Sequence, residues 1–394
     1  MRKAVVFLPI LLLAACNREP ATPQPTAEAT PSQAAAPSPT ADPMLSHDGA
    51  ADSGPPDSEP RPAMQAQVAL DRLGFTPGVV DGKIGLSTRN AVSGFQEAND
   101  LAVTGELDPA TTAALAKLGD IPATRVVTIP ADFAAGPFYA IPDAPADQAK
   151  MPALGYASLD EKLAERFHTT VATLRLLNPG GVPAGMSAAP IPPPSPTLAA
   201  ENAGSAFAPK PDPASTFRAG QQIRVPNVGA DRIDAGAVED AGWRGTLALL
   251  GVGTAQPKAD RVVVSKSKGT LKAYDKADKL VAVYTATMGS QHDPLPLGTW
   301  KVTGVSRNPP FHYNPDLFWD ARAGDEKAKL PPGPNGPVGV VWIDLSKEHY
   351  GIHGTPNPET IGRAQSHGCV RLTNWDAARL ALMVGPGTQV LFEA

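Results

Sequence analysis

The chain has 394 residues and a formal net charge of −5, and it contains 44 prolines but only 6% aromatic residues. This length allows two or three domains, and the many prolines predict long linkers or loops between them. No basic block stands out along the sequence, so we expect no nucleic-acid partner.

The first residues have the pattern of an export signal. A short basic start precedes an apolar run, Ala4–Ala15, which is too short for a stable transmembrane helix. The run ends in Ala-Ala-Cys16, which resembles the cleavage box of bacterial lipoproteins. This resemblance implies a lipoprotein signal over residues 1–16, lipid on Cys16 and a periplasmic protein, and Asn17 favours the outer membrane. The alternative is an ordinary signal peptide with an accidental cysteine.

Residues 17–62 have the composition of a disordered tether. They consist mainly of Ala, Pro, Thr, Ser and acidic residues, with almost no large apolar side chains. Such a segment cannot bury enough apolar surface to fold. We therefore expect a flexible spacer between the lipid and the folded body.

Residues 63–119 have the pattern of three short helices. Apolar residues recur at helical spacing from Met64, a second helix follows Thr88, and Asp108-Pro109 opens a third. The segment resembles the peptidoglycan-binding domain of cell-wall enzymes, which implies peptidoglycan as a partner, while any small three-helix unit is the alternative. The residues that carry the resemblance are Leu73-Gly74-Phe75, Val80-Asp81-Gly82, Gly85, Phe95-Gln96 and Val103-Thr104-Gly105.

A linker over 120–150 is predicted to lead into a small α+β module over 151–227. Ser158 and Glu161 have the spacing of a capping box, and Thr169 or Thr170 is expected to cap a second helix. With Tyr156, these two helices, Leu177-Asn178 and a closing strand over 220–226, the segment resembles a LysM module, which implies binding of N-acetylglucosamine glycans. An insertion at about 181–215 departs from the LysM pattern.

After a connector over 228–258, with a short helix expected over 237–249, the hydrophobic period changes to two. Short β-branched strands and one late helix predict a mainly β-sandwich domain over 259–394. The chain as a whole is therefore predicted to be multidomain. The segment 306–337 lacks periodicity and is predicted to be a functional loop or lid. The expected strands are 261–266, 269–274, 280–288, 298–305, 338–345 and 390–392, and the expected helix is 374–384.

The residues suited to covalent chemistry gather near the C-terminus. His353-Gly354 precedes Ser366-His367-Gly368-Cys369-Val370-Arg371, although the whole chain has only two cysteines and seven histidines. A thiol is mostly protonated at neutral pH, so it needs a base or an electropositive environment before it can act as a nucleophile. The sequence supplies two histidines and one arginine close to Cys369.

This motif resembles the signature of the L,D-transpeptidases of bacterial cell walls, with YkuD-type catalytic domains. The resemblance implies Cys369 as the nucleophile, His353 as its proton acceptor and the Gly354 carbonyl as the group that orients the imidazole. Supporting motifs are Met288-Gly289, Pro296-Leu297-Gly298-Thr299-Trp300, Leu330-Pro331-Pro332-Gly333-Pro334 and Gly351-Ile352.

The remaining motif residues are assigned to the pocket. The N–H groups of His367, Gly368 and Cys369 are expected to face a tetrahedral oxyanion, and Ser366 is expected to support the loop. Arg371 would lower the thiol pKa or hold a substrate carboxylate, and a structural ion pair is its equally weighted alternative.

The resemblance implies an L,D-transpeptidase that forms 3→3 cross-links or attaches a protein, such as an outer-membrane lipoprotein, to the wall. It also implies covalent inhibition by carbapenem-type β-lactams and no cofactor or metal. Two alternatives stay open for the catalytic domain: an L,D-carboxypeptidase that uses the same site, and an inactive wall-binding tether. Zinc binding by His353, His367 and Cys369 is a further alternative, although the spacing differs from the usual zinc motifs.

Overall fold

The computed structural model describes residues 56–117, 119, 121–186, 215–229, 233–234 and 236–394. The predicted signal with Cys16 lies outside these residues, as do the tether up to residue 55 and most of the predicted insertion. None of the helices in these ranges is long and apolar enough to cross a membrane.

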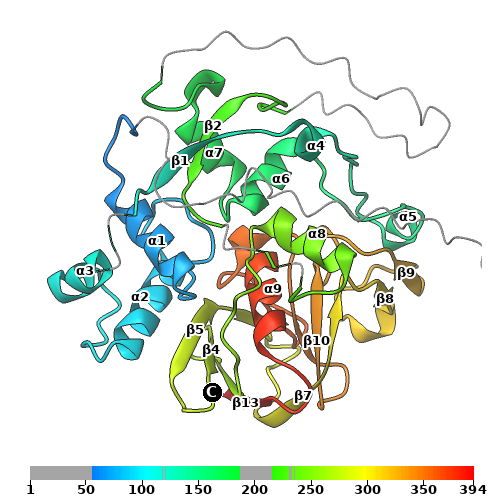
Figure 1. The fold of residues 1–394 in the computed structure, drawn as a ribbon. Coiled ribbons are helices and arrows are strands. Elements are labelled where there is room, and N and C mark those ends of the chain that lie inside the picture. Colours follow the sequence, from blue (N-terminus) through cyan, green and yellow to red (C-terminus); the bar gives the residue numbers. More distant parts are fainter. Residues whose placement is uncertain (1–55, 118, 120, 187–214, 230–232, 235) are drawn as a thin grey trace, which may run out of the picture. The chain divides into compact units, whose positions relative to one another are not determined.

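The first described module contains the three predicted helices (Figure 1). The Asp108 side chain accepts a hydrogen bond from the Thr111 N–H at 2.8 Å and so caps the third helix. Buried glutamines on the first two helices hold the intervening turns, because each side-chain oxygen accepts backbone N–H groups of a turn. The helices are α1 (Pro62–Arg72), α2 (Leu86–Ala98) and α3 (Pro109–Ala116).

The second module has a β-α-α-β core. Ser158 and Thr170 cap its two helices, as the sequence predicts. Its first strand, Thr124–Thr128, lies in the segment predicted as a linker, so that prediction is wrong for these residues. The core elements are β1 (Thr124–Thr128), α6 (Leu159–Arg166), α7 (Val171–Leu177) and β2 (Gln222–Pro226), and β1 and β2 are antiparallel. The connections add α4 (Ala131–Ala134), α5 (Pro145–Gln148) and η1 (Pro179–Gly181).

The C-terminal module is rich in β-structure, as predicted, but its strands do not form two separate sheets. Within the described residues they form one nine-stranded sheet in the order β5-β4-β3-β13-β7-β10-β11-β12-β6. The long strand β7 (Gly298–Arg307) joins the halves, since its first part pairs with β13 and its second part with β10. The other strands are β3 (Arg261–Ser265), β4 (Thr270–Tyr274), β5 (Leu280–Thr285), β6 (Thr287–Met288), β10 (Val341–Leu345), β11 (Gly351–His353), β12 (Val370–Arg371) and β13 (Gln389–Glu393).

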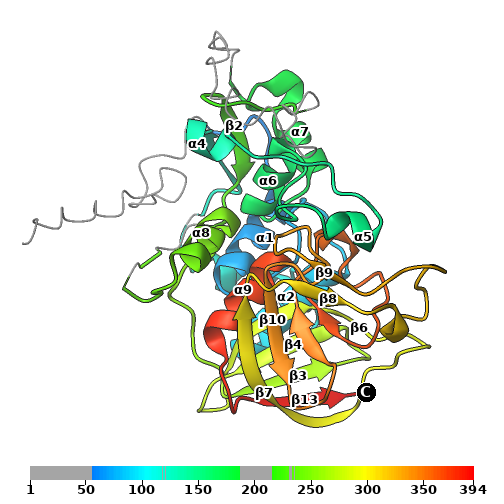
Figure 2. The same ribbon diagram turned by 90° about the vertical axis from the view of Figure 1, so that its right-hand side faces the viewer.

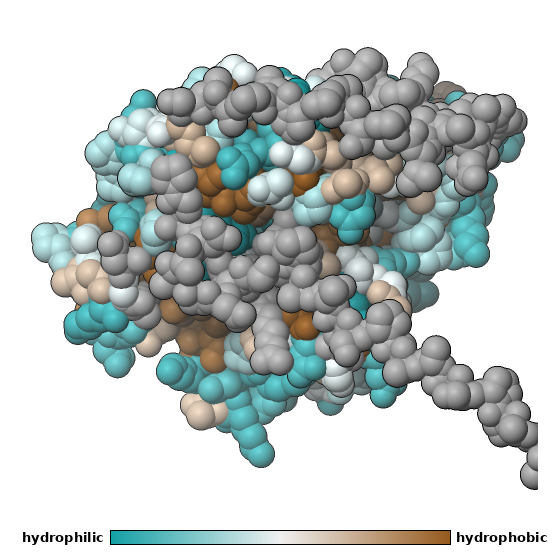
Figure 3. Space-filling view, turned by 45° about the horizontal axis from the view of Figure 1, so that its top comes forward, coloured by the Kyte–Doolittle hydropathy of each residue, from teal (hydrophilic) through white to brown (hydrophobic). Residues whose placement is uncertain are grey.

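Two helices cover the core of this sheet. Trp243 on α8 (Ala241–Leu250) and Trp375 on α9 (Asn374–Met383) are fully buried against its aliphatic side chains. Figure 2 shows α9 lying against the strands. On the face drawn in Figure 3, apolar residues form separate patches among hydrophilic ones. The α9 helix matters for the site because it begins directly after β12.

The segment 306–337 is not the irregular loop that the sequence predicts. It contains a two-stranded hairpin, β8 (Phe311–Tyr313) with β9 (Ala328–Leu330), and the short helix η2 (Pro315–Leu317) between them. A further short helix, η3 (Pro358–Thr360), follows β11. Aromatic residues interrupt the alternation of apolar and polar residues in this segment. They pack on each other, as the rings of Tyr313 and Phe318 do with centroids 5.4 Å apart.

Candidate active site

The parallel pair β11 and β12 brings the motif residues together. Ile352 lies opposite Val370, and His353 lies opposite Arg371. Because side chains alternate along a strand, Cys369, Arg371 and His353 project from the same face, while Ile352 and Val370 are buried in the core on the other. By the same register, Gly351 occupies the position beside Cys369, two residues before His353 on β11.

His353 is held as a neutral base. Its side chain is only 4% exposed, and Nδ1 lies 2.7 Å from the carbonyl oxygen of Gly354. A carbonyl only accepts, so Nδ1 carries the proton and Nε2 keeps its lone pair. Burial and the charge of Arg371 lower the His353 pKa to about 3. The Trp342 indole, directly opposite on β10, stacks on the imidazole with centroids 5.5 Å apart.

Cys369 is half-buried and remains a thiol at neutral pH. Burial raises its pKa, although the Gly351 N–H and the charge of Arg371 act in the opposite direction. The sulfur also makes a weak contact, at 3.8 Å, with the carbonyl oxygen of His349. The resting site therefore contains a neutral thiol and a neutral imidazole rather than a preformed ion pair.

Ser366 fixes the backbone just before the thiol. Its hydroxyl donates to the Cys369 carbonyl at 2.6 Å and accepts from the Gly289 N–H at 2.6 Å. Gly368 has a φ of +94°, and a methyl group there would meet the Tyr350 ring at 2.6 Å. The Ser-His-Gly-Cys sequence thus makes a tight turn that only glycine allows at its third position.

His367 binds the hairpin segment rather than the thiol. Its Nε2 lies 2.7 Å from Oδ1 of Asp320, and the Phe318 ring packs edge-on against it at 4.9 Å between centroids. Trp319, from the same segment, stacks on His292 at 4.4 Å. The 306–337 segment therefore covers one side of the site.

Two further side chains near the thiol have a polar atom without a hydrogen-bond partner. Among the described residues, Nε of Arg371 and Oδ2 of Asp293 are buried without a hydrogen-bond partner. Arg371 makes a 3.3 Å bond through Nη1 to the Gln365 carbonyl and has no carboxylate within ion-pair distance in the described part of the chain. A cation and a carboxylate beside a nucleophile suit the carboxylate and amine groups of a peptide substrate.

Sequence reasoning missed Trp342, Tyr350, Asp320 and Asp293. The signal for Trp342 was present, since it lies on a period-two strand that could pair with the strand of His353. Asp320 and Asp293 carry no local motif, because only the folded chain brings their loops to the site. In the described ranges, no three His, Cys, Asp or Glu side chains are grouped closely enough to hold a metal ion.

The fold and site define a β-rich domain in which Cys369, directly before β12, lies beside β11, the strand that carries the buried His353. Residues 259–391 match the L,D-transpeptidase catalytic domain family (YkuD), and residues 62–115 match a putative peptidoglycan binding domain. The chain is 30% identical over 136 residues to the putative L,D-transpeptidase YqjB of Bacillus subtilis, which covers 33% of this chain and 69% of that protein. The chain belongs to the L,D-transpeptidase family.

Two other similarities were found. The chain is 37% identical over 130 residues to the putative L,D-transpeptidase YkuD of Bacillus licheniformis, covering 33% of this chain and 63% of that relative. This match spans less than two thirds of the relative's length. A crystal structure of L,D-transpeptidase 3 from Mycobacterium tuberculosis, in complex with a faropenem-derived adduct, aligns with a TM-score of 0.29 and 20% identity, over 34% of this chain and 60% of that chain.

Proposed function

We propose that this protein is a peptidoglycan L,D-transpeptidase that works through a thioester on Cys369. The observation that carries the proposal is the shared face of β11 and β12, where a neutral buried imidazole accompanies the thiol. The donor is a tetrapeptide stem. The sulfur forms a bond to the carbonyl carbon of the third residue, and the bond to the terminal D-Ala nitrogen breaks.

His353 moves the protons in both half-reactions. Its Nε2 lone pair accepts the thiol proton as the sulfur attacks, and the resulting imidazolium returns that proton to the leaving D-Ala amine. The Gly354 carbonyl keeps the ring in this tautomer. In the second step the acceptor amine gives a proton to Nε2, its nitrogen bonds to the carbonyl carbon, and the thiolate leaves and is reprotonated.

The turn before Cys369 supplies the oxyanion site. The N–H groups of His367, Gly368 and Cys369 are assigned to the tetrahedral oxygen, and each such donor typically lowers the barrier by about 2.7–4 kcal/mol. Ser366 supports this function because its two short hydrogen bonds fix the loop. Arg371 is assigned to a substrate carboxylate, and His367 to shaping the pocket.

The rest of the chain would hold this catalyst against an insoluble polymer. The β1-α6-α7-β2 order supports a LysM-like module for glycan, in addition to the peptidoglycan-binding helices. A lipid on Cys16 and the following tether would place the protein in the periplasm, at the outer membrane. Several weak attachments raise the effective concentration of the stems around Cys369.

The proposal is tested with the full chain in detergent and purified disaccharide-tetrapeptide, followed by mass spectrometry. We expect a dimer whose mass equals two substrates less one D-Ala, which indicates a stem amine as acceptor. Release of D-Ala without a dimer would indicate water, or a protein acceptor absent from the assay. Neither product nor thioester would favour the inactive tether, and metal analysis of the pure protein tests the zinc alternative.

The charge of Arg371 is expected to set the pH range of the reaction. Arg371 lowers the pKa values of both His353 and Cys369, so replacing Arg371 by Met should raise both. Protonation of the base then begins at a higher pH, and so does thiolate formation. Rates of thioester formation measured from pH 3 to 10 should shift upward in pH on both limbs relative to the wild type.

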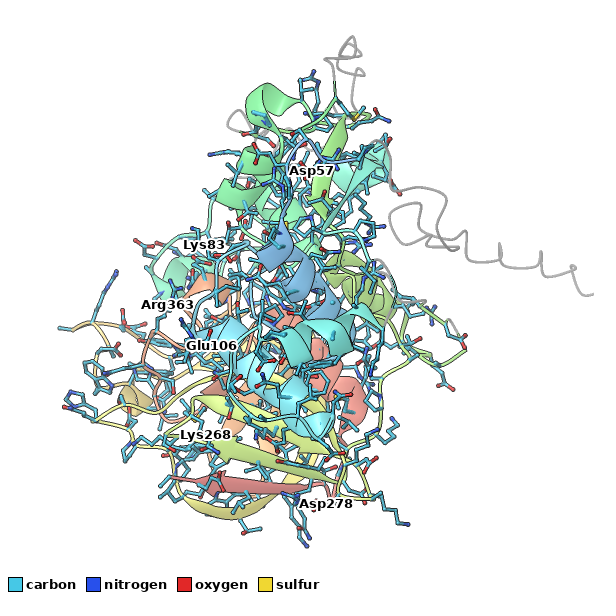
Figure 4. The ribbon with its side chains drawn as sticks, turned by 90° about the vertical axis from the view of Figure 1, so that its left-hand side faces the viewer. Asp57, Lys83, Glu106, Lys268, Asp278 and Arg363 are labelled. Atoms are coloured by element: carbon cyan, nitrogen blue, oxygen red, sulfur yellow. The ribbon has the colours of Figure 1, made fainter. Side chains whose placement is uncertain are left out.

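The matched control is Arg363, an exposed residue of the connection between β11 and β12, which is labelled in Figure 4. Replacing Arg363 by Met also removes one positive charge, but outside the site. It should leave the pH profile of thioester formation unchanged. An unchanged profile in Arg371→Met would contradict an electrostatic role for this residue.

A further inference from the structure

The backbone that orients His353 rests on a buried asparagine. Asn374 is fully buried at the first position of α9, and its Oδ1 accepts a hydrogen bond from the Val340 N–H at 3.3 Å. A methyl group on Gly354 would overlap this oxygen. Asn374 is therefore in direct contact with the peptide whose carbonyl accepts the His353 Nδ1–H.

The other end of the Asn374 amide is held by a different module. Its Nδ2 donates to Oε1 of Glu165 at 2.7 Å and to the Pro334 carbonyl at 3.2 Å. Both amide hydrogens are thus used, which fixes Oδ1 toward Gly354. Glu165 lies on α6, is only 7% exposed, and is also hydrogen-bonded by the Tyr156 side chain.

A second set of contacts joins the same two modules next to the site. The Leu154 N–H donates to the Pro332 carbonyl at 3.0 Å, and the Leu154 carbonyl accepts from the Asn335 N–H at 2.9 Å. The Asn335 side chain donates to the Gly155 carbonyl at 2.9 Å. These bonds pin the segment that contains Pro334, the second acceptor of the Asn374 amide.

The geometry points to Glu165 as a positioning residue for the transfer reaction, acting through Asn374 and Gly354 on the imidazole of His353. This inference rests on the proposed function, since it takes His353 to be the base. The LysM-like module is then part of the catalytic apparatus as well as a wall-binding unit. Truncating Glu165 leaves a buried N–H of Asn374 without an acceptor, so the amide is free to turn away from Gly354.

The reaction should be sensitive to this change because small displacements of a catalytic group have large effects on rate. A misplacement of about 1 Å costs on the order of 100-fold. The substrate contacts on the β11–β12 face stay the same, so binding should change little. We therefore expect a loss in the maximum rate of thioester formation rather than in the half-saturating concentration.

The test uses the full chain with three substitutions: Glu165→Ala, Glu165→Gln and Asp160→Ala. Asp160 is a matched control on the same helix, since it is buried and binds Ser215, Thr216 and Arg175 inside the module without reaching Asn374. Glu165→Gln keeps an oxygen that accepts from Asn374. The readouts are the saturation curve for thioester formation and the ¹H–¹⁵N NMR signal of the His353 Nδ1–H.

We expect Glu165→Ala to lower the maximum rate about 10- to 100-fold at unchanged half-saturation and to shift the His353 signal. Glu165→Gln should stay within about threefold of the wild type, and Asp160→Ala should leave the NMR signal in place. A wild-type rate and signal in Glu165→Ala, or equal losses in Glu165→Ala and Asp160→Ala, would overturn the inference. The NMR readout does not depend on turnover, so this inference and the proposed function can fail separately. A wild type without activity would contradict the proposed function alone.

Discussion

Replacing Cys369 by Ala is expected to remove D-Ala release, thioester formation and cross-linking down to background. In the proposed mechanism the sulfur forms the acyl bond, and no other nucleophile projects from the same face of β11 and β12 beside His353 in the described part of the chain. Intact-protein mass spectrometry with the tetrapeptide should detect an acyl adduct on the wild type and none on the variant. A carbapenem should likewise form a covalent adduct with the wild type and none with the variant.

The variant should remain folded, which makes this loss interpretable. The thiol's polar contacts are a long one of 3.8 Å to the His349 carbonyl and one with the Gly351 N–H, so its removal should change the melting temperature little. Ser366→Ala is the matched comparison, because it removes two short hydrogen bonds from the same loop and should lower activity together with local stability. If Cys369→Ala still released D-Ala, the nucleophile would lie elsewhere in the chain.

The sequence alone could predict the residues of the motif but not the environment that tunes them. Cys369, His353 and Gly354 are identifiable because their motif resembles the signature of the L,D-transpeptidases. The neutrality of His353 depends on burial under Trp342 and on the charge of Arg371, which are properties of the assembled sheet. No local pattern encodes a pKa, so the resting protonation state of the site needed the structure.

Sequence analysis also could not identify elements whose partners lie far away in the sequence. The strand β1 has the ordinary composition of a short β-branched run inside a proline-rich segment, and its partner β2 comes only after both helices. The role inferred for Glu165 has the same origin. On α6 it looks like a charged helix residue, and only its contact with Asn374 connects it to the site.

The three modules meet at one buried ion cluster. Asp71 on α1 is fully buried and makes two hydrogen bonds to the Arg379 guanidinium of α9, at 3.0 and 2.8 Å. It also lies 3.1 Å from Nδ1 of His168, which follows α6 and stacks on Trp375 at 4.9 Å. A helix of the segment that matches a peptidoglycan binding domain, the module that contains α6 and the C-terminal domain thus share one carboxylate.

Replacing Asp71 by Ala is expected to destabilise the protein by about 3–5 kcal/mol, because it leaves the Arg379 charge buried without its main partner. Urea unfolding should report the loss, and limited proteolysis should report release of α1. The double variant Asp71→Leu/Arg379→Met should recover most of the stability, since apolar side chains of similar volume replace the pair. By contrast, Glu97→Gln, at the partly exposed pair with Lys272, should cost at most about 1 kcal/mol.

The pH dependence gives an independent test of the same carboxylate. Burial opposes ionisation of Asp71, but Arg379 and His168 hold its pKa well below the usual range. The folded state therefore binds fewer protons at this site than the unfolded state, and the contribution of Asp71 is present above about pH 4 and is lost as the pH falls further. The stability difference between wild type and Asp71→Ala should be constant from pH 7 to 5 and shrink at lower pH. A difference that stayed constant down to pH 2 would mean that Asp71 stabilises the protein by packing rather than by its charge.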